Sequence, residues 1–458
     1  MKNKIKSESI LKKRIRKFKS IKRGYYSLII LISMFIFSLS APLFVNDAAL
    51  IVKYNGKYYF PFINKIIEDR EWLSSIFKLE HYGPDKEILG GNLETKSYRL
   101  LQKKLNNDDN PNSYVIMPLY PYAPVDDIDA LYELDEPYVD SNGNERYDNA
   151  EPFDDCGIDA ICKEDENWVS PDLGENDNLF TVGENFKDLN WNGKYDDAEE
   201  YRDLNYNQKR DEYKPTTLPN WFSNDDNPGI YTPHILGTDN NGNDVFAKLV
   251  YGFKISFTFA LIVWAFSYTI GIIIGAIMGY FGGKLDLFGM RIIEVYGSMP
   301  FLFILMILAT FMKPNVIILA LMYVFLTGWI GISWYIRGEF LREKSKDYVA
   351  AAVSLGQSHL KIMFKHILPN ALTPIVTFAP FAIIGYISAL VSLDYLGFGL
   401  GEGTPSWGEV LKQGGTNPLD WHLIVFPLIA MAITLFLITL IGEAVRAAFD
   451  PKVHSRLR

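Results

Sequence analysis

Long apolar runs without charged residues dominate the second half of the chain and occur once near its start. Six of them are long enough to cross a bilayer, because about 20 apolar helical residues span the hydrocarbon core of roughly 30 Å. These runs are Tyr25–Val45, Ile255–Phe281, Val295–Met312, Pro314–Ile336, Ile367–Leu393 and Trp421–Gly442. One such helix could be buried in a soluble protein, but six indicate a membrane protein. The pattern therefore predicts an all-α membrane protein with six transmembrane helices.

Polar stretches between these runs predict the domain organisation. A basic tail at 1–24 precedes transmembrane helix 1 at 25–46, and an insertion follows at 47–236. A core at 237–450 holds helices 2–6 with a loop at 338–366, and a short tail occupies 451–458. Within the insertion, Leu50–Phe62 has the composition of two strands around an Asn55-Gly56 turn. Residues 105–230 are rich in Asp, Asn, Gly and Pro, so little regular structure is predicted there.

The net charge of −9 hides an asymmetry that predicts orientation. Residues 47–250 carry 42 acidic and 19 basic side chains, whereas the rest of the chain carries 12 acidic and 26 basic ones. The first 24 residues hold 11 basic residues and one acidic residue. Because Lys and Arg are enriched in cytoplasmic segments, both termini and the loop at 338–366 are predicted to be cytoplasmic. The acidic insertion at 47–236 is then external, or periplasmic, and the chain lies in the cell inner membrane.

Two features leave alternatives open. The basic start, the first apolar run and the small residues Ser38-Leu39-Ser40-Ala41 also fit a cleaved signal peptide, although the run is longer than a usual signal core. Cys156 and Cys162 lie in the predicted external insertion, where an oxidising compartment would permit a disulfide bond. Two free thiols are the alternative there.

Small residues on the second apolar run predict close helix packing. Gly271, Gly275 and Gly279 follow one another at i, i+4 and i+8, and therefore share one helical face. Glycines at this spacing allow two membrane helices to approach closely. The pattern predicts a packed bundle and carries no information about a substrate.

The loop between the fourth and fifth runs has the pattern of a helical element at the cytoplasmic surface. Its Ala-rich part, Asp347–Leu355, predicts a helix that ends near Gly356. A second amphipathic helix is predicted from Gln357 to Pro369, where the fifth transmembrane helix begins. Basic residues flank both parts, so an interfacial helix without any protein partner is one interpretation.

This loop resembles the EAA loop of ABC importer permeases, which reads Glu-Ala-Ala, three residues, Gly, nine residues, Ile, one residue and Leu-Pro. Ala351, Ala352, Gly356, Leu368 and Pro369 match this pattern, and Ala350 stands where the family has Glu. His366-Ile367 also departs from the Ile-x pair. The resemblance implies that these residues couple the chain to a separate ABC ATPase subunit. The chain has no G-x-x-x-x-G-K-[ST] phosphate loop, so ATP is expected to bind to that partner and the chain is not expected to be an enzyme.

Further motifs narrow the resemblance to permeases of dipeptide and oligopeptide importers. Residues 236–244 are similar to the L-G-T-D-x-x-G-R-D element of these permeases, with Asn243 in place of Arg. The sequences at 23–25, 58–61, 392–400, 405–408, 442–446 and 449–451 also match, most closely the second permease of the importer of oligopeptides and microcin C. The resemblance implies the type I importer fold, a second homologous permease, an external substrate-binding protein and a peptide substrate. The lipid bilayer is a partner in this interpretation, and nucleic acid is not.

Ionisable residues at the ends of the apolar runs are candidates for function, because burying them in a membrane is costly. Asp394 lies near the external end of the fifth run and is predicted to face the translocation path, with a structural hydrogen bond as the alternative. Arg291 and Glu294 are spaced i, i+3 and are predicted to form a local ion pair.

The insertion contains a repeated pattern of oxygen-bearing side chains that predicts calcium binding. In an EF-hand loop, positions 1, 3, 5, 9 and 12 supply side-chain oxygens and position 7 supplies a carbonyl. The best copy has Asp188, Asn190, Asn192, Lys194, Asp196 and Glu199, with Gly193 at position 6. A second copy has Asp140, Asn142, Asn144, Asp148 and Glu151, and a third, weaker copy has Asp203, Asn205, Asn207 and Asp211. A solvated acidic loop is the alternative, and the permease core is expected to need no cofactor.

The sequence therefore favours a transmembrane permease subunit that forms half of a translocation path for oligopeptides or peptide-like compounds. A permease of the same family for nickel or a peptide antibiotic is the nearest alternative. A membrane-anchored calcium sensor or adhesion module is a more distant one, because an anchor needs neither six helices nor the loop at 347–369.

Overall fold

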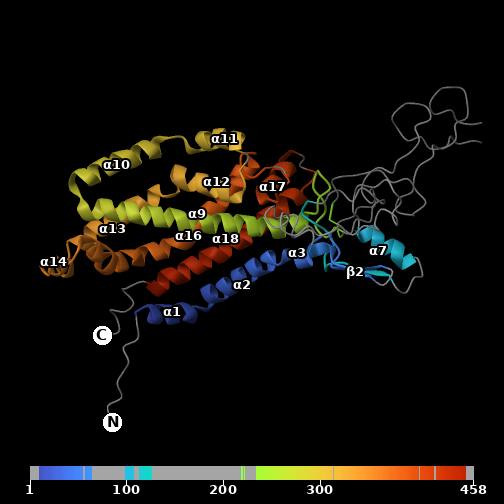
Figure 1. The fold of residues 1–458 in the computed structure, drawn as a ribbon, viewed down its shortest axis with the longest axis horizontal. Coiled ribbons are helices and arrows are strands. Elements are labelled where there is room, and N and C mark those ends of the chain that lie inside the picture. The colour runs from blue at the N-terminus through green and yellow to red at the C-terminus, as the bar shows by residue number, and fades with distance from the viewer. Residues whose placement is uncertain are drawn as a thin grey trace, which may run out of the picture. The chain divides into compact units, whose positions relative to one another are not determined.

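The computed structural model describes residues 10–54, 57–63, 98–107, 113–125, 218–219, 221, 234–312, 314–401, 403–416 and 419–449. The chain divides into two compact units, residues 1–128 with 215–458 and residues 129–214, and every described residue belongs to the first. This unit consists of long helices and a small sheet (Figure 1). The predicted calcium loops and both cysteines lie outside the described residues.

The core of the first unit is a helical bundle. Its elements are α9 (Val245–Phe281), α10 (Gly283–Ser298), α11 (Phe301–Met312), α12 (Val316–Tyr323), the π-helix η1 (Val324–Gly328), α13 (Ile330–Lys344), α14 (Asp347–Ser354), α15 (His359–Lys361), the π-helix η2 (Ile362–Ile367), α16 (Leu368–Tyr395), α17 (Trp407–Thr416) and α18 (His422–Phe449). Near the start of the described chain lie the helices α1 (Ile10–Ser20), α2 (Lys22–Leu39) and α3 (Ala41–Phe44).

Four described helices contain an apolar segment long enough to cross a membrane: α2, α9, α16 and α18. The third and fourth predicted spans are instead broken into helix pairs. The pair α10 and α11 bends by 70°, and the pair α12–η1 and α13 bends by 48°. Counting each bent pair as one span gives six, so the predicted all-α membrane fold is confirmed, and the bends in two of the spans are a feature that the apolar runs did not predict. Pro300 at the first break has no N–H to continue a helical hydrogen-bond ladder.

Glycines of α9 bring α13 into close contact, as their spacing predicts. A Cβ atom at Gly279 would lie 2.6 Å from the Phe340 Cβ and 2.7 Å from the Arg337 carbonyl oxygen. One helical turn earlier on each helix, Gly275 packs directly against Ser333. The α9–α13 contact therefore depends on bare glycine surfaces, because a methyl group has no space there.

The N-terminal helices pack along the C-terminal helix α18. Gly24 of α2 contacts Ala444 of α18 so closely that a Cβ atom could not be accommodated. Side chains of α2, α9, α16 and α18, including Leu31, Phe253, Ile387 and Ile438, form one of the buried clusters. Figure 1 shows α2, α9, α16 and α18 with similarly oriented axes, α2 and α16 running in one direction and α9 and α18 in the other.

A three-stranded antiparallel sheet follows α3. Its strands are β1 (Ile51–Tyr54), β2 (Lys57–Tyr59) and β3 (Tyr114–Ile116), in the order β2-β1-β3, and α7 (Tyr98–Asn107) packs on it. Val52 pairs with Tyr59 and with Val115. The strands predicted within Leu50–Phe62 are thus confirmed, whereas the partner strand β3 has no counterpart in the sequence prediction.

Candidate functional site

The Ala-rich segment forms a separate short helix, as predicted. Helix α14 ends at Ser354, and Gly356 adopts a φ of +67°, a left-handed conformation that glycine reaches without strain. The Gly356 amide donates to the Val353 carbonyl at 2.9 Å, and the Gln357 amide donates to the Ala352 carbonyl at 3.2 Å. These bonds close the helix end and turn the chain toward α15.

The chain then continues as one helical path through α15, η2 and α16. The predicted amphipathic helix is present as α15 and η2, and the fifth predicted span follows it where expected: α16 begins at Leu368, one residue before Pro369, and runs to Tyr395. Pro369 lies in the first turn of α16, directly after the π-helical turn of η2, where a missing N–H is tolerated. This path buries Ile362, Met363 and Ile367 against Val349 and Ala352 of α14.

The opposite side of the segment exposes apolar side chains. Relative exposure is 56% for Val353, 78% for Leu355, 67% for Leu360 and 52% for Phe364. We call these four residues the α14 surface. Exposed apolar side chains gathered on one short segment are typical of a protein contact site, because their exposure to water is unfavourable.

The predicted coupling residues divide between the two sides of this segment. Ala350, Ala351, Gly356 and Pro369 are exposed, and Leu368 is half-buried. Ala352 is 4% exposed and packs inside the segment. A partner could therefore contact Ala351 directly, whereas Ala352 sets the packing of α14 on η2.

Tyr280, at the end of α9, connects this segment to two bundle helices. Its hydroxyl is hydrogen-bonded to Nδ1 of His359 at 2.8 Å. Its carbonyl oxygen accepts a hydrogen bond from Lys344 Nζ, at the end of α13, at 2.5 Å. Tyr280 therefore bonds both to His359 of α15 and to Lys344 of α13.

Glu343 forms a second connection at the same end of the bundle. It is 2% exposed and accepts hydrogen bonds from Lys346 Nζ at 2.6 Å and from the Tyr348 hydroxyl at 2.7 Å. Asn370 Nδ2 donates to the Tyr348 hydroxyl at 3.2 Å. Burial and the bond to Glu343 both raise the pKa of Tyr348, so its phenol stays protonated and remains a donor. Helices α13, α14 and α16 are joined through these groups.

An ionic network lies where α9 begins. Asp239 is fully buried, and its carboxylate accepts hydrogen bonds from the Asn241 and Asn243 amides at 2.9 Å each. Buried Lys248 forms an ion pair with Asp239 and a longer one, at 3.3 Å, with Glu409 of α17. Lys248 of α9 thus supplies a cation beside Asp239. Asp239 belongs to the element at 236–244, in which Asn243 stands where similar permeases have Arg.

Asp244 begins α9 and connects it to the sheet-bearing segment. Its Oδ1 caps the helix by accepting from the Ala247 amide at 2.7 Å. Its Oδ2 accepts from the Tyr120 hydroxyl at 2.5 Å and from His234 Nδ1 at 2.8 Å. Burial, followed by the charge of Asp244, raises the pKa of Tyr120, which keeps the phenol a donor.

Asp394 is 5% exposed and organises the turn between α16 and α17. Its Oδ2 accepts from the Ser406 hydroxyl, and its Oδ1 accepts from the Leu400 amide at 2.7 Å. Gly399 and Gly408 approach Asp394 so closely that neither could carry a Cβ atom without displacing it. Both carboxylate oxygens are therefore engaged within the chain.

Residues 271–455, which contain these elements from the middle of α9 onward, match the family described as the binding-protein-dependent transport system inner membrane component. Over 442 residues the chain is 32% identical to the peptidoglycan transport system permease protein YejE of Agrobacterium fabrum. That alignment covers 96% of this chain and 93% of that protein. The chain belongs to this family of transport permeases. It is an inner membrane permease subunit of an ABC importer, not itself an enzyme.

Other relatives align with part of the permease. It is 46% identical over 217 residues to the inner membrane ABC transporter permease protein YejE of Escherichia coli, covering 47% of this chain and 63% of that protein. It is 36% identical over 220 residues to the oligopeptide permease OppC of Haemophilus influenzae, covering 48% and 70%. Among solved structures, the inward-facing methionine transporter MetNI is 20% identical with a TM-score of 0.35, covering 44% of this chain and 97% of that one.

Sequence patterns located some residues of the permease site and missed others. The Arg291–Glu294 pair is confirmed at 2.5 Å. Among the described residues, no group of three or more His, Cys, Asp or Glu side chains is placed to hold a metal ion, and the predicted calcium loops lie elsewhere. The roles of Tyr280, Lys344 and Tyr348 were missed, because single residues at helix ends carry no periodic signal.

Proposed function

We propose that this permease imports peptides or peptide-like compounds, with peptidoglycan-derived peptides as the favoured class. The relatives named above include a peptidoglycan transport permease and oligopeptide permeases, and the first of these aligns over nearly the whole chain. The α14 surface is the observation that supports a transport subunit driven by a partner. It is exposed, yet residues Tyr280 and Glu343 connect it to the bundle helices that would have to move.

Three partner assignments belong to this proposal. An ABC ATPase docks on the α14 surface in the cytoplasm, and its closure moves α15 against Tyr280. A second homologous permease completes the translocation path. An external substrate-binding protein delivers the substrate on the opposite side, where residues 47–236 lie. The basic residues near α1 and α14 and the acidic residues of the insertion support this orientation.

The docking step is tested by substitution on the exposed side of α14. Ala351→Glu places a charge on the proposed contact without entering the packed interior, where Ala352 lies. We expect ATPase subunits to be lost from the purified complex and uptake to fall at least tenfold. Thr416→Glu, an exposed position on α17, is the matched control and should leave both unchanged. Normal ATPase capture by Ala351→Glu would refute docking on this surface.

Substrate class is tested by uptake into vesicles that contain the complete importer. Labelled muropeptides and tetrapeptides should accumulate in an ATP-dependent manner, and each should compete with the other. Nickel accumulation without peptide uptake would instead support the alternative permease of the same family. Because ATPase capture is measured separately, failure of the substrate assignment would leave the coupling assignment standing.

Asp394 enters this proposal as a structural residue of the turn after α16, rather than as a residue of the path, because both of its oxygens are bonded within the chain. Asp394→Asn should lower thermal stability and leave relative uptake of charged and neutral peptides unchanged. A changed preference between those peptides, at normal stability, would assign Asp394 to the path.

Calcium binding by the insertion remains a prediction with its own experiment. Titrating the full-length permease in detergent with calcium should release heat, with affinity of about 10⁻⁴–10⁻³ M. The variant Asp188→Asn/Glu199→Gln should lose part of that heat, whereas Asp286→Asn, in α10, should retain it all. Absence of calcium heat from the intact chain would leave the acidic loops as solvated segments.

A further inference from the structure

Helix α1 carries an unusually dense set of cations. Six of its 11 residues are Lys or Arg, and none is acidic. It directly precedes α2, the first candidate membrane span, which begins at Lys22 and continues with Arg23. Any group bound by α1 therefore lies at the membrane boundary.

Two other helices hold α1 in place at that boundary. Arg14 donates a hydrogen bond to the Thr373 hydroxyl of α16 at 3.3 Å, and its guanidinium lies 4.7 Å from the ring centroid of Phe449 in α18. Phe18 packs against the buried cluster shared by α2 and α18. These contacts fix which side of α1 faces outward, so it is a positioned element and not a free tail.

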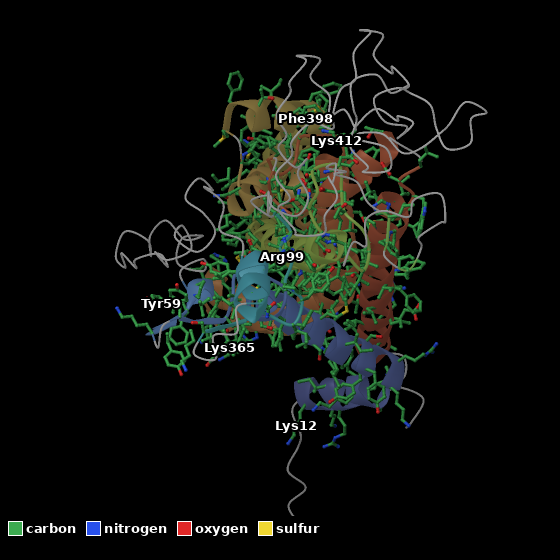
Figure 2. The ribbon with its side chains drawn as sticks, turned by 90° about the vertical axis from the view of Figure 1, so that its right-hand side faces the viewer. Lys12, Tyr59, Arg99, Lys365, Phe398 and Lys412 are labelled. Atoms are coloured by element: carbon green, nitrogen blue, oxygen red, sulfur yellow. The ribbon has the colours of Figure 1, made fainter. Side chains whose placement is uncertain are left out.

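The outward side presents a row of positive charges. Lys12, Arg16 and Lys19 follow at i, i+4 and i+7 and therefore share one face, and all three are exposed. Figure 2 shows Lys12 on the outer side of α1, directed away from the other helices. Ile15, on the same side, is 48% exposed. Cations beside an exposed aliphatic residue match a surface of anionic headgroups over acyl chains.

Lys17 is an independent indication of an anionic ligand. Its ammonium nitrogen is enclosed by the surrounding atoms and has no hydrogen-bond partner among the described residues. An enclosed ammonium without a partner is unfavourable, because it loses water and gains no compensating charge. Lys13 lies one turn earlier at i−4 and is exposed, so a phosphate group can contact Lys13 directly, and its negative charge would compensate the enclosed charge of Lys17 nearby.

We propose that α1 binds the phosphate headgroups of anionic lipids, and that this contact fixes the helix at the cytoplasmic leaflet. Clusters of four or more cations beside a membrane span attract such headgroups electrostatically. The phosphate site consists of Lys13, which contacts the headgroup, and the charge of Lys17 behind it, and Lys12, Arg16 and Lys19 extend the attraction along the leaflet. The inference does not depend on which substrate the importer carries.

Lipid selectivity of the full-length permease tests this site. The protein is reconstituted in phosphatidylcholine vesicles that contain a spin-labelled phosphatidylglycerol or a spin-labelled phosphatidylcholine. Electron spin resonance then gives the protein-bound fraction of each labelled lipid. Wild type should bind phosphatidylglycerol preferentially, and raising the ionic strength from about 0.01 M to 1 M should weaken that preference.

Two variants separate the phosphate site from the rest of the charge. Lys13→Gln/Lys17→Gln should lower the selectivity at least threefold, and Lys12→Gln/Lys19→Gln, which alters only exposed side chains, should lower it about twofold or more. Lys57→Gln/Lys412→Gln removes the same charge from exposed positions outside α1 and should leave selectivity unchanged.

Three outcomes would overturn the inference. Unchanged selectivity in both α1 variants would show that the helix does not select lipid. An equal loss in the Lys57→Gln/Lys412→Gln control would reduce the effect to net charge. Unchanged selectivity with loss of ATPase subunits from the complex would assign α1 to a protein partner instead.

Discussion

Single glycines decide how closely helices α9 and α13 of the bundle can approach each other. At Gly279 of α9, the space a methyl group would occupy holds the Phe340 Cβ and the Arg337 carbonyl oxygen of α13. Neither atom can move without moving α13, because one belongs to the backbone and the other is attached to it. A flexible side chain would have yielded more easily.

We therefore expect Gly279→Ala to destabilise the permease by about 1–3 kcal/mol, the usual range for overpacking a tight interior. Gly331→Ala in α13 is the matched control, since a Cβ there meets no atom within 4 Å. It should be neutral or slightly stabilising, because alanine is the better helix former. Thermal unfolding in detergent measures both. Equal stability of the two variants would contradict the close α9–α13 contact.

Glu409 gives a residue-scale prediction about pH. Burial raises its pKa above the ordinary value of 4.5, against the opposing effect of Lys248. A carboxyl group whose pKa is raised on folding binds its proton more tightly in the folded state. Its contribution to stability is therefore greatest below pH 4.5 and is lost as the pH rises through the folded-state pKa.

The stability difference between wild type and Glu409→Gln should accordingly shift in favour of wild type as the pH is lowered from 7 toward 4.5. The stability of the variant is subtracted from that of wild type because other carboxylates, such as the hydrogen-bonded Glu343, also make stability depend on pH, and they do so in both proteins. Denaturant unfolding at several pH values, with Thr416→Ser as the neutral control, provides the measurement. A pH-independent difference would show that Glu409 does not titrate in this range.

At the scale of elements, the sequence predicted α14 and its break because both depend on local chemistry. Alanine favours helix, and Gly356 permits the left-handed turn that ends it. The expected start of the fifth span at Pro369 is confirmed within one residue, since α16 begins at Leu368 and a proline in a first helical turn is tolerated. The π-helical turn η2 directly before it was not predicted. Asp244 was recognised only as part of a motif, although its role as helix cap follows from its position before the apolar run.

The connection from α14 to the bundle gives a prediction at this scale. Tyr280→Phe removes the hydroxyl bonded to His359 while keeping the ring, which should free α15 and η2 by about 0.5–1.5 kcal/mol. Backbone amides of 359–367 should then exchange with deuterium about two- to tenfold faster, while those of α18 stay unchanged. Tyr335→Phe, whose ring packs on Phe378, is the control. Unaltered exchange in Tyr280→Phe would exclude this residue as the connection.

At the scale of the whole molecule, the six apolar runs predicted the fold class, and what they could not predict is long-range. The bend within the fourth span lies directly after the π-helix η1, whose residues are as apolar as the rest of the run. The contact of Tyr120 with Asp244 joins residues 124 positions apart. Periodicity records which side of an element is buried, but it contains no information about which distant element covers it.

Orientation is the whole-molecule property that the charge pattern predicts most directly, and it can be tested by labelling. In a background with Cys156 and Cys162 replaced by Ser, Lys57→Cys should react with a membrane-impermeant maleimide on intact spheroplasts. Lys361→Cys, next to the α14 surface, should react only after permeabilisation, because the Lys and Arg residues at that end of the bundle predict a cytoplasmic location. Both positions are exposed, so accessibility within the protein does not distinguish them. The reverse pattern would place the α14 surface outside and remove it from the reach of any cytoplasmic ATPase.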